Sequence, residues 1–362
     1  MSDAVDSGNV TPRGLVREDI LKLSAYHVAS AAGMVKLDAM ENPYRLPDVL
    51  RDEVARAVAN AAINRYPDPA APELKARLRE VMRIPAASDI LIGNGSDEII
   101  AIVTQALARP EAVVIAPEPT FVMYRMNAGL SGARFVGVPL KADFSLDTGA
   151  LLDRIKEERP ALVWLAYPNN PTGNLFPAAD IESVIRATPG LVVVDEAYNI
   201  FAGRTFLDRV PEFSNLMVMR TVSKVGLAGI RLGYAAAAPA WIREFDKVRP
   251  PYNVSVLTQV VAERVLAHMP VFEEQAANIK KERSRMIDAL AAMGRVQIFP
   301  TEANFVLIRV PDAPKVNDHL QRSKILVRNF HGSHPMLANC LRLTVGTPGE
   351  NILLLAALAQ AL

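Results

Sequence analysis

The sequence has 362 residues and a mass of 39.4 kDa, which at about 150 residues per domain predicts two domains. Half of the residues are hydrophobic and 22% are charged, a composition that excludes a wholly disordered chain. The 40 Lys and Arg residues balance 39 Asp and Glu residues, and a net charge of +1 argues against a protein that binds the phosphate backbone of nucleic acids.

The expected location follows from three further features. No uninterrupted apolar run approaches the roughly 18–20 residues that span a bilayer. The acidic start, MSDAVDSGNV, lacks the apolar core of a secretory signal. The single cysteine, Cys340, excludes an internal disulfide and fits a reducing compartment. We therefore expect a cytoplasmic protein without nucleic-acid or membrane partners.

The first part of the chain is predicted to be irregular. Residues 1–20 are polar and contain two glycines and a proline, which indicates a loose arm, and the chain stays irregular to about residue 45. Apolar residues at helical spacing then predict a helix over 48–61 with Asp48 as its N-cap. A second helix follows three prolines between residues 67 and 72.

Short β-rich runs alternate with helical stretches between about residues 89 and 237. Several runs are apolar on both faces, as in strands that helices cover from both sides. This alternation predicts an α/β fold with a doubly wound, mostly parallel sheet. The predicted strands are 89–93, 112–117, 133–140, 161–168, 191–197, 216–221 and 231–238.

The pattern changes after Pro250 and Pro251. Two long helical patterns lead into a mixture of strands and helix, which predicts a smaller α+β domain. The helices are expected over 254–268 and 270–293, the strands over 304–310, 325–330 and 340–346, and a last helix over 351–362. We therefore divide the chain into an arm over 1–37, a large domain over 38–265 and a small domain over 266–362.

A glycine-containing turn, GNGSDEII, follows the first predicted strand and opens a helical pattern at 93–100. Backbone N–H groups can converge on an anion at such a turn, and the helix dipole favours its negative charge. The alternative is an ordinary turn in which Ser96 or Asp97 caps the helix.

Asp195 follows four apolar residues at the carboxyl end of a predicted strand, where open α/β sheets bind their ligands. A carboxylate buried there needs a cation or hydrogen-bond donors. We favour such a partner over the alternative, in which Asp195 caps the next turn. In YPNNPTG (167–173), Asn170 offers a donor at the same edge, although a proline-rich turn alone explains the motif.

Lys224 lies just beyond another predicted strand, among small residues that predict partial burial of its amine. Burial lowers the pKa of an amine and makes it nucleophilic. Arg231 and the hydroxyls of Thr221 and Ser223 suit a phosphate dianion. A lysine that bonds to an aldehyde, an acid for a ring nitrogen and a phosphate-binding loop together describe a site for pyridoxal 5′-phosphate.

The ordered set GSDE, PTF, NNPTG, DEAY, SK and GIRLGY resembles the fold-type I pyridoxal phosphate-dependent aminotransferases. Within them, the chain is similar to the histidinol-phosphate aminotransferases over about residues 26–350. The resemblance implies a large doubly wound domain that binds the cofactor, a smaller α+β domain, and an arm that contributes to the small domain and to the contacts of a homodimer. The motifs that carry it are NRYPDP, YPNNPTG, DEAYNIF, SKVGLAGIRLGY and CLRLTVGTPGEN.

The resemblance also implies roles for individual residues. Lys224 would bind the cofactor covalently and move a proton, and Asp195 would pair with the ring nitrogen. Tyr198 and Asn170 would donate to the ring's phenolic oxygen, and Phe121 would stack on the ring, where many relatives have tyrosine. The implied phosphate-binding residues are Ser96 and Asp97 through their backbone, Thr221, Ser223 and Arg231.

Further implied contacts lie outside these motifs. Tyr66 would reach the cofactor phosphate of the neighbouring subunit, so the active sites of the homodimer would be shared. Tyr26, Asn170, Arg328 and Arg342 would bind substrate. Arg342 would hold the carboxylate of glutamate in one half-reaction and share the substrate phosphate with Arg328 in the other.

The sequence departs from the family pattern at two places. The segment KVGLAGIR is one residue shorter than in many relatives, which bears on the reach of Arg231 to the phosphate. The segment LDAMENPY differs from the common Asn-rich form, which leaves the contact of Asn42 open. His331 and His334 lie three residues apart without a nearby cluster of Cys, Asp or Glu, so we expect no metal.

The implied reaction transfers an amino group between L-histidinol phosphate and 2-oxoglutarate, giving imidazole acetol phosphate and L-glutamate in histidine biosynthesis. Two enzymes of the same fold are alternatives: an aromatic amino acid aminotransferase and a threonine-phosphate decarboxylase. A non-catalytic regulator that binds pyridoxal phosphate is a third, but only about 40 residues precede the α/β pattern and they contain no basic helix.

Overall fold

The computed structural model of the protein describes residues 12–25 and 29–362. The chain divides into two units, Met1–Ala32 and Gly33–Leu362. The first contains the short helix α1 (Glu18–Leu21). In the second unit the sequence forms two sheets.

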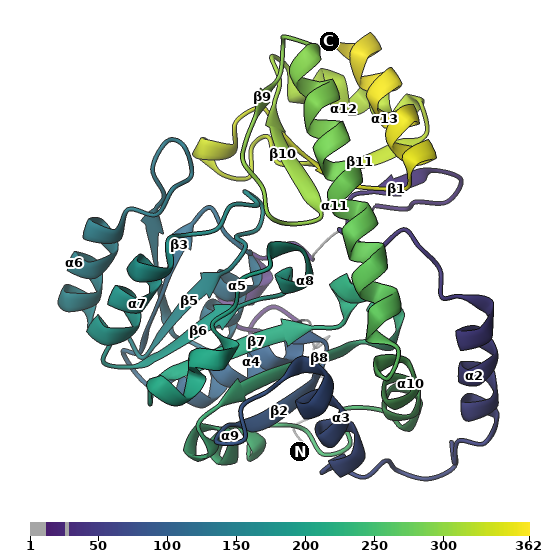
Figure 1. Ribbon diagram of the computed structural model, residues 1–362. Coiled ribbons are helices and arrows are strands. Elements are labelled where there is room, and N and C mark those ends of the chain that lie inside the picture. The colour runs from purple at the N-terminus through teal and green to yellow at the C-terminus, as the bar shows by residue number, and fades with distance from the viewer. Residues whose placement is uncertain (1–11, 26–28) are drawn as a thin grey trace, which may run out of the picture. The chain divides into compact units, whose positions relative to one another are not determined.

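The larger sheet has seven strands in the order β2-β8-β7-β6-β5-β3-β4 (Figure 1). Neighbouring strands are parallel except that β8 runs antiparallel to both β2 and β7. The predicted doubly wound, mostly parallel sheet is therefore confirmed. The strands are β2 (Asp89–Asn94), β3 (Val113–Glu118), β4 (Arg134–Pro139), β5 (Leu162–Ala166), β6 (Leu191–Asp195), β7 (Leu216–Thr221) and β8 (Leu232–Ala237).

Both faces of this sheet are buried because its strands are apolar at consecutive positions. Along β5, Val163 and Leu165 join one core, and Trp164 joins the core on the opposite face. The first core includes residues of α2 (Asp48–Ala59), α3 (Pro72–Met82), α6 (Thr148–Glu158), α7 (Ala178–Ala187) and α10 (Val256–Leu266). The second includes residues of α4 (Ser96–Leu107), α5 (Met123–Leu130) and α9 (Pro239–Asp246).

The smaller sheet has five strands in the order β1-β11-β12-β10-β9, and only the β1–β11 pair is parallel. Strand β1 comes from the segment predicted as the arm. The strands are β1 (Val35–Leu37), β9 (Gln297–Ile298), β10 (Phe305–Arg309), β11 (Ile325–Asn329) and β12 (Cys340–Thr344). The hydrophobic core on this sheet also contains residues of three helices, α11 (Met269–Ala292), α12 (Ala313–Arg322) and α13 (Pro348–Ala361).

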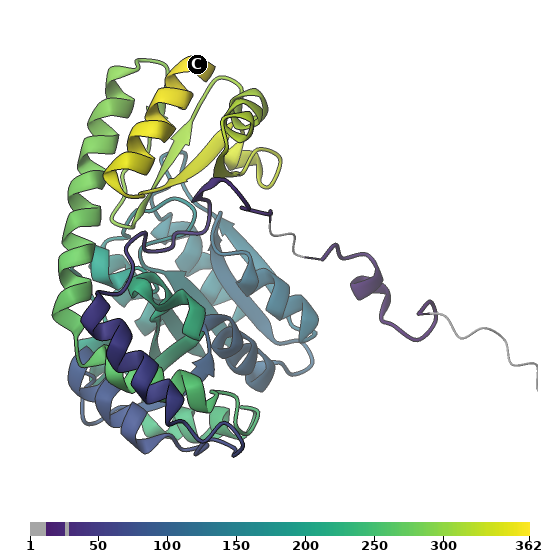
Figure 2. The same ribbon diagram turned by 90° about the vertical axis from the view of Figure 1, so that its right-hand side faces the viewer.

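The long helix α11 continues the chain from α10 toward the smaller sheet, as both ribbon views show (Figures 1 and 2). The short helix α8 (Asn199–Ala202) follows β6 and contacts α11. Tyr198, just before α8, packs edge-on against Phe305 of β10 at 5.2 Å. The edge of the large sheet thus meets the core of the smaller one at Tyr198. Residues Gly33–Leu362 form one compact unit, and a domain border at residue 265 stays a prediction.

The prediction for the start of α2 was wrong by one residue. Asp48 is the first helical residue and Pro47 is the N-cap, without a side-chain hydrogen bond. Asp48 instead accepts a hydrogen bond from Arg51 within the first turn, at 2.8 Å. The remaining short elements are η1 (Leu207–Glu212), η2 (Ser223–Leu227), η3 (Ala228–Ile230) and η4 (Pro335–Leu337).

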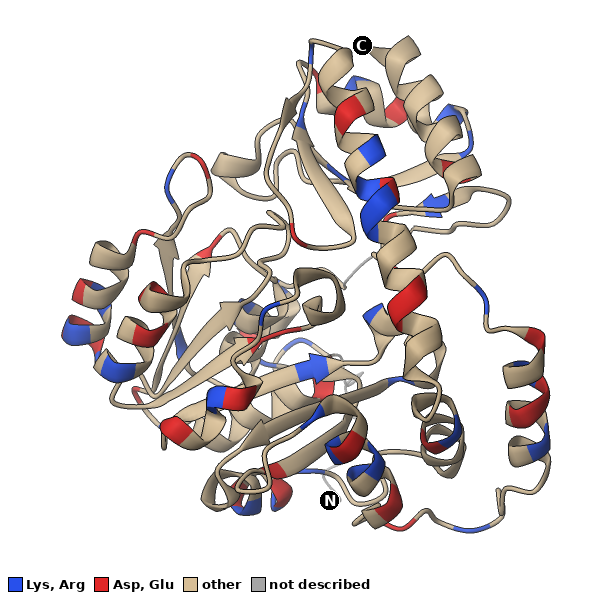
Figure 3. Ribbon diagram, in the orientation of Figure 1, with Lys and Arg blue, Asp and Glu red and all other residues tan. Residues whose placement is uncertain are grey.

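Charged residues of both signs are interspersed along the outer helices and are sparse on the strands of the large sheet (Figure 3). This agrees with the balanced composition. Within residues 12–25 and 29–362, no helix combines the length and apolarity that crossing a membrane requires.

Candidate active site

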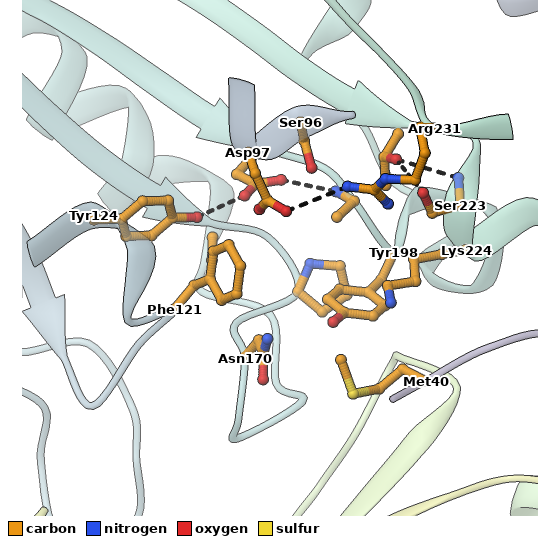
Figure 4. A pocket seen from close by; sticks show the side chains of 15 residues that line it. Met40, Ser96, Asp97, Phe121, Tyr124, Asn170, Tyr198, Ser223, Lys224 and Arg231 are labelled. Carbon is orange, nitrogen blue, oxygen red and sulfur yellow. Dashed lines mark hydrogen bonds and ion pairs between the residues drawn. The ribbon is translucent and has the colours of Figure 1, made fainter. Parts of the chain in front are cut away.

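One cavity opens at the edge of the large sheet where β5, β6 and β7 end (Figure 4). The carboxyl ends of parallel strands meet at this edge, which is why separate motifs converge there. Every predicted cofactor residue except Tyr66 lines the cavity: Ser96, Asp97, Phe121, Asn170, Asp195, Tyr198, Thr221, Ser223, Lys224 and Arg231. The sequence did not point to the other lining residues, Met40, Tyr124, Ala166, Pro168 and Ala197.

Asp195 ends β6 and is 5% exposed. The hydroxyl of Tyr124 donates to its Oδ2 at 2.6 Å, and the backbone N–H of Ala197 donates to its Oδ1 at 3.0 Å. Burial raises the pKa of Asp195 to about 6, although these two donors act in the opposite direction. A cationic N–H group in the cavity would stabilise the charged form of this carboxyl.

Lys224 lies in the turn η2 directly after β7, and its Nζ donates to the backbone oxygen of Ala39 at 2.8 Å. Burial lowers the pKa of this amine to about 8, and the nearby charge of Arg342 acts in the same direction. The neutral, nucleophilic form of the amine is therefore far more populated near neutral pH than in an ordinary lysine.

The contact of Asn42 is resolved in the structure. Its Nδ2 donates to the backbone oxygen of Val225 and to Oε1 of Gln275, each at 2.8 Å. Asn42 therefore ties the segment before α2 to the residue that follows Lys224. The amine of Lys224 meets a backbone carbonyl of the same segment.

The glycine-containing turn predicted to bind phosphate lies at the N-terminus of α4. Gly95 precedes this helix with φ +84°, and a Cβ atom there would lie 2.6 Å from Nη2 of Arg231. A Cβ on Gly233 of β8 would lie 2.5 Å from the backbone nitrogen of Ser96. Glycine at both positions lets the guanidinium and β8 approach the free N–H groups of the helix. Such a site attracts an anion.

Arg231 reaches this place through the shortened segment. The turns η2 and η3 follow β7, and Arg231 itself adopts φ +52° before β8 begins. Its guanidinium is half exposed and lies 3.5 Å from the carboxylate of Asp97. The hydroxyls of Thr221 and Ser223 are 3.0 Å apart and line the same part of the cavity.

Asn170 and Arg342 are joined in the structure. Nη1 of Arg342 donates to Oδ1 of Asn170 at 2.5 Å, and Nη2 donates to the backbone oxygen of Asp38 at 2.8 Å. The guanidinium of Arg342 lies 5.3 Å from the ring centre of Phe305 and 5.2 Å from that of Phe330. Because Oδ1 of Asn170 faces Arg342, its amide N–H groups are left to donate elsewhere. Asn170 and Tyr198 face the same space as the amine of Lys224 (Figure 4).

Two other predicted residues, Arg328 and Tyr66, do not line this cavity. Arg328, in β11, is the cross-strand neighbour of Arg342. Tyr66 is 80% exposed and stacks on Tyr252 with 4.5 Å between the ring centres. Tyr26 lies outside the described residues.

A buried ion pair that was not predicted from the sequence lies beside the site. Arg220 of β7 donates through Nη2 to Glu196 at 2.7 Å, and their side chains are 7% and 0% exposed. Glu196 also accepts from the hydroxyl of Thr205. The pair joins the residue after Asp195 to the residue before Thr221, so it fixes the ends of two strands. The charged residues Glu196 in DEAY and Arg220 in MRT, each beside a predicted strand end, could have indicated this pair.

The predicted absence of a metal concerned His331 and His334. Nδ1 of His331 accepts from the backbone N–H of Asn339, and Nδ1 of His334 accepts from that of Met336. Both therefore stabilise local backbone. In the part of the chain that the structure describes, no three His, Cys, Asp or Glu side chains are grouped to hold a metal ion.

The cavity residues fit pyridoxal 5′-phosphate. Asp195 is a buried carboxyl suited to a charged ring nitrogen, and Lys224 supplies an amine with a lowered pKa. Phe121 offers an aromatic face to the same cavity. At the N-terminus of α4, the close approach of Arg231 to Gly95 forms a site for a phosphate.

Comparison with known proteins agrees with this geometry. The family model for aminotransferase class I and II matches residues 32–358. The chain is 57% identical to histidinol-phosphate aminotransferase of Chromobacterium violaceum, over 97% of this chain and 99% of that protein. It is 56% identical to histidinol-phosphate aminotransferase 1 of Ralstonia nicotianae, over 96% and 94% of the two chains.

One similar solved structure contains the cofactor. The crystal structure of histidinol-phosphate aminotransferase from Sinorhizobium meliloti, in complex with pyridoxal-5′-phosphate, superposes with a TM-score of 0.85 at 27% identity. The match covers 94% of this chain and 96% of that one. The chain belongs to the class I and II aminotransferases and, within them, to the family of the histidinol-phosphate aminotransferases.

Proposed function

We propose that the protein is a pyridoxal phosphate-dependent aminotransferase that acts on L-histidinol phosphate and 2-oxoglutarate. The products are imidazole acetol phosphate and L-glutamate, and the reaction belongs to histidine biosynthesis. The observation that carries the proposal is one cavity with an amine of lowered pKa, a buried carboxyl and a phosphate-binding turn. Relatives of 52–57% identity with this activity in their names support the choice of substrate.

The cofactor, when bound, supplies a conjugated ring that delocalises the negative charge developing at the substrate carbon. The protein's residues hold and orient it. Arg231, Ser223 and Thr221 bind its phosphate together with the N-terminus of α4. Asp195, which lines the cavity, would accept a hydrogen bond from the ring nitrogen and keep it protonated, and Phe121 would pack on the ring face.

Lys224 has two tasks in this proposal. In its neutral form, its amine would hold the cofactor's aldehyde carbon as an imine, with loss of water, and the free amine would move the proton at the substrate carbon. Its contact with the backbone oxygen of Ala39 gives the free amine a fixed position. Asn170 and Tyr198 donate hydrogen bonds to the phenolic oxygen of the cofactor.

Arg342 and Arg328 bind the substrate's anionic end. Histidinol phosphate has a phosphate and no carboxylate, whereas glutamate has carboxylates and no phosphate. Arg342 is held in place by Asn170, Asp38 and two aromatic rings, which suits a residue that serves both substrates. Arg328 adds the second positive charge that a phosphate dianion requires.

A substrate panel tests the proposal. The purified protein, loaded with cofactor, is mixed in single turnovers with histidinol phosphate, histidinol, phenylalanine and threonine phosphate, and the cofactor absorbance is followed. Histidinol phosphate should react at least tenfold faster than histidinol. Faster reaction with phenylalanine would favour the aromatic aminotransferase, and release of carbon dioxide from threonine phosphate would favour the decarboxylase.

We also propose a cytoplasmic homodimer with shared active sites. Tyr66 lies outside the cavity of its own chain, and Val49 and Ile63 of the same region are also exposed, at 73% and 72%. An exposed aromatic and apolar segment is suited to contact with a second copy of the chain. In that dimer, Tyr66 reaches the cofactor phosphate of the neighbouring subunit.

Subunit mixing tests the shared site. The Tyr66→Ala and Lys224→Ala variants should each be inactive, and their mixture should regain activity through heterodimers with one intact site. Mixing two separately tagged Lys224→Ala preparations is the control and should regain none. A fully active monomer would contradict the proposal.

A further inference from the structure

Tyr124 lines the cavity, and its hydroxyl donates a hydrogen bond to the carboxylate of Asp195. Its side chain comes from α5, it is 0% exposed, and its Oη lies 2.6 Å from Oδ2 of Asp195 (Figure 4). The sequence separation of 71 residues means that the fold alone brings the two together. None of the roles proposed above uses this hydrogen bond.

The ring of Tyr124 is fixed by two aromatic neighbours. It stacks on Trp164 of β5 with 4.8 Å between ring centres and 5° between the planes. On another side it meets Phe121 edge-on, at 5.7 Å and 85°. Phe121 is the residue proposed to pack on the cofactor ring. Tyr124 therefore contacts two of the groups that position the cofactor, one through its hydroxyl and one through its ring.

The phenol can act only as the donor in this hydrogen bond. Burial and the neighbouring Asp195 raise the pKa of Tyr124 well above its usual range, so its proton stays on the phenol oxygen. Oδ1 of Asp195 accepts from the backbone N–H of Ala197. With one donor on each oxygen, the plane of the carboxylate is fixed and its remaining lone pairs are directed to the cavity.

We propose that Tyr124 is a positioning residue, whose hydroxyl keeps Asp195 charged and oriented for a ring nitrogen and whose ring sets the position of Phe121. The inference rests on the proposed function, because it presumes that Asp195 binds that nitrogen. Without the hydroxyl, Asp195 would keep one donor, and its pKa would rise. The carboxyl would then be neutral up to a higher pH and would bind a cationic ring more weakly.

The pH dependence of cofactor binding reports this effect. The charged and titratable groups around Asp195 are Asp97 of α4, Glu196 and Tyr198 of the segment after β6, and Lys224 and Arg231 of the segment after β7. These groups remain in a Tyr124→Phe variant. A shift between the binding curves of wild type and variant therefore reports the loss of the Tyr124 hydroxyl.

The experiment titrates cofactor-free protein with pyridoxal phosphate between pH 5 and pH 9. For Tyr124→Phe we expect a dissociation constant about tenfold higher at neutral pH, with the acidic fall in affinity displaced to higher pH. Tyr167→Phe is the matched control, because Tyr167 is also buried but packs against Phe206 on the other face of the sheet. Its curve should coincide with wild type.

Two further variants of the protein complete the test. Incorporation of 3-fluorotyrosine at position 124 retains the ring and makes the phenol a stronger donor, so the acidic fall should move to lower pH. Unchanged curves for both changes at position 124 would overturn the role of Tyr124. If Asp195→Asn also leaves the affinity unchanged, the proposed pairing of Asp195 with the ring nitrogen fails instead.

Discussion

Arg328 of β11 and Arg342 of β12 lie directly opposite each other on antiparallel strands. Like charges at such positions destabilise a sheet. Their guanidinium groups share the ring of Phe330, at 5.9 Å and 5.2 Å from its centre. A doubly charged anion between them would offset the repulsion. In the proposed function, this anion is the phosphate of the substrate.

The two arginines should differ in their effects. Arg342→Ala should slow the half-reactions with glutamate and with histidinol phosphate, whereas Arg328→Ala should slow mainly the second. Each loss of hydrogen bonds to a charged group should lower the specificity constant by about ten- to a hundredfold. Single-turnover absorbance measures both half-reactions. Arg322→Ala, which changes an exposed arginine at the end of α12, is the control, and an Arg328→Ala variant with an unchanged histidinol phosphate reaction would disprove the assignment.

Gly95→Ala should weaken cofactor binding about tenfold because a Cβ atom would displace Arg231 from the phosphate site. Gly132→Ala is a matched control, since Gly132 has a similar φ of +79° but nothing within 4 Å of the added atom. Both variants should lose about 1–3 kcal/mol of stability from backbone strain, and Gly95→Ala should lose more, because its ψ of 165° places Gly95 in a region essentially restricted to glycine. Titration with pyridoxal phosphate distinguishes the two variants. Equal affinities for the cofactor in both would contradict the proposed contact between Arg231 and the phosphate.

Lys224→Met should stabilise the cofactor-free protein at pH 7 by about 1–3 kcal/mol, because the native protein must keep a buried amine charged. The folded-state pKa is about 8, below the ordinary value of 10.5. Between these values the unfolded chain binds more protons, so wild-type stability rises with pH. The difference between wild type and variant in urea unfolding should shrink across that window. A constant difference from pH 7 to pH 10.5 would be inconsistent with the depressed pKa.

Glu196→Gln should destabilise the protein by about 3–5 kcal/mol, because Arg220 would be left as a buried charge without its anionic partner. Glu182→Gln removes a carboxylate of a surface ion pair with Arg186 and should cost about 0–1 kcal/mol. Urea denaturation of the two variants makes the comparison. Similar small losses in both would mean that the buried pair does not fix the strand ends.

Much of the fold could be predicted from the sequence because its strands are short, apolar and separated by turn residues. The carboxyl ends of parallel strands meet at one edge, so Asp195 and Lys224 could be expected to lie close together. The helix N-terminus at Ser96 could be expected from the glycines that precede it. These inferences needed only local pattern and the general rule for α/β sheets.

Contacts set by tertiary distance could not be predicted in the same way. The bond from Tyr124 to Asp195 joins a helix and a strand end far apart in sequence, and nothing local marks Tyr124 except its place three residues after Phe121. The opposition of Arg328 and Arg342 depends on strand register. The partner of Tyr66 depends on a second chain, which a single sequence does not describe.

Transfer of labelled nitrogen tests the central claim most directly. Purified protein with pyridoxal phosphate is given ¹⁵N-labelled L-glutamate and an equal mixture of imidazole acetol phosphate and phenylpyruvate, and the products are measured by mass spectrometry. We expect the label to enter histidinol phosphate first and predominantly, and we expect Lys224→Ala to transfer none. Faster labelling of phenylalanine, or labelling by the Lys224→Ala variant at the wild-type rate, would contradict it.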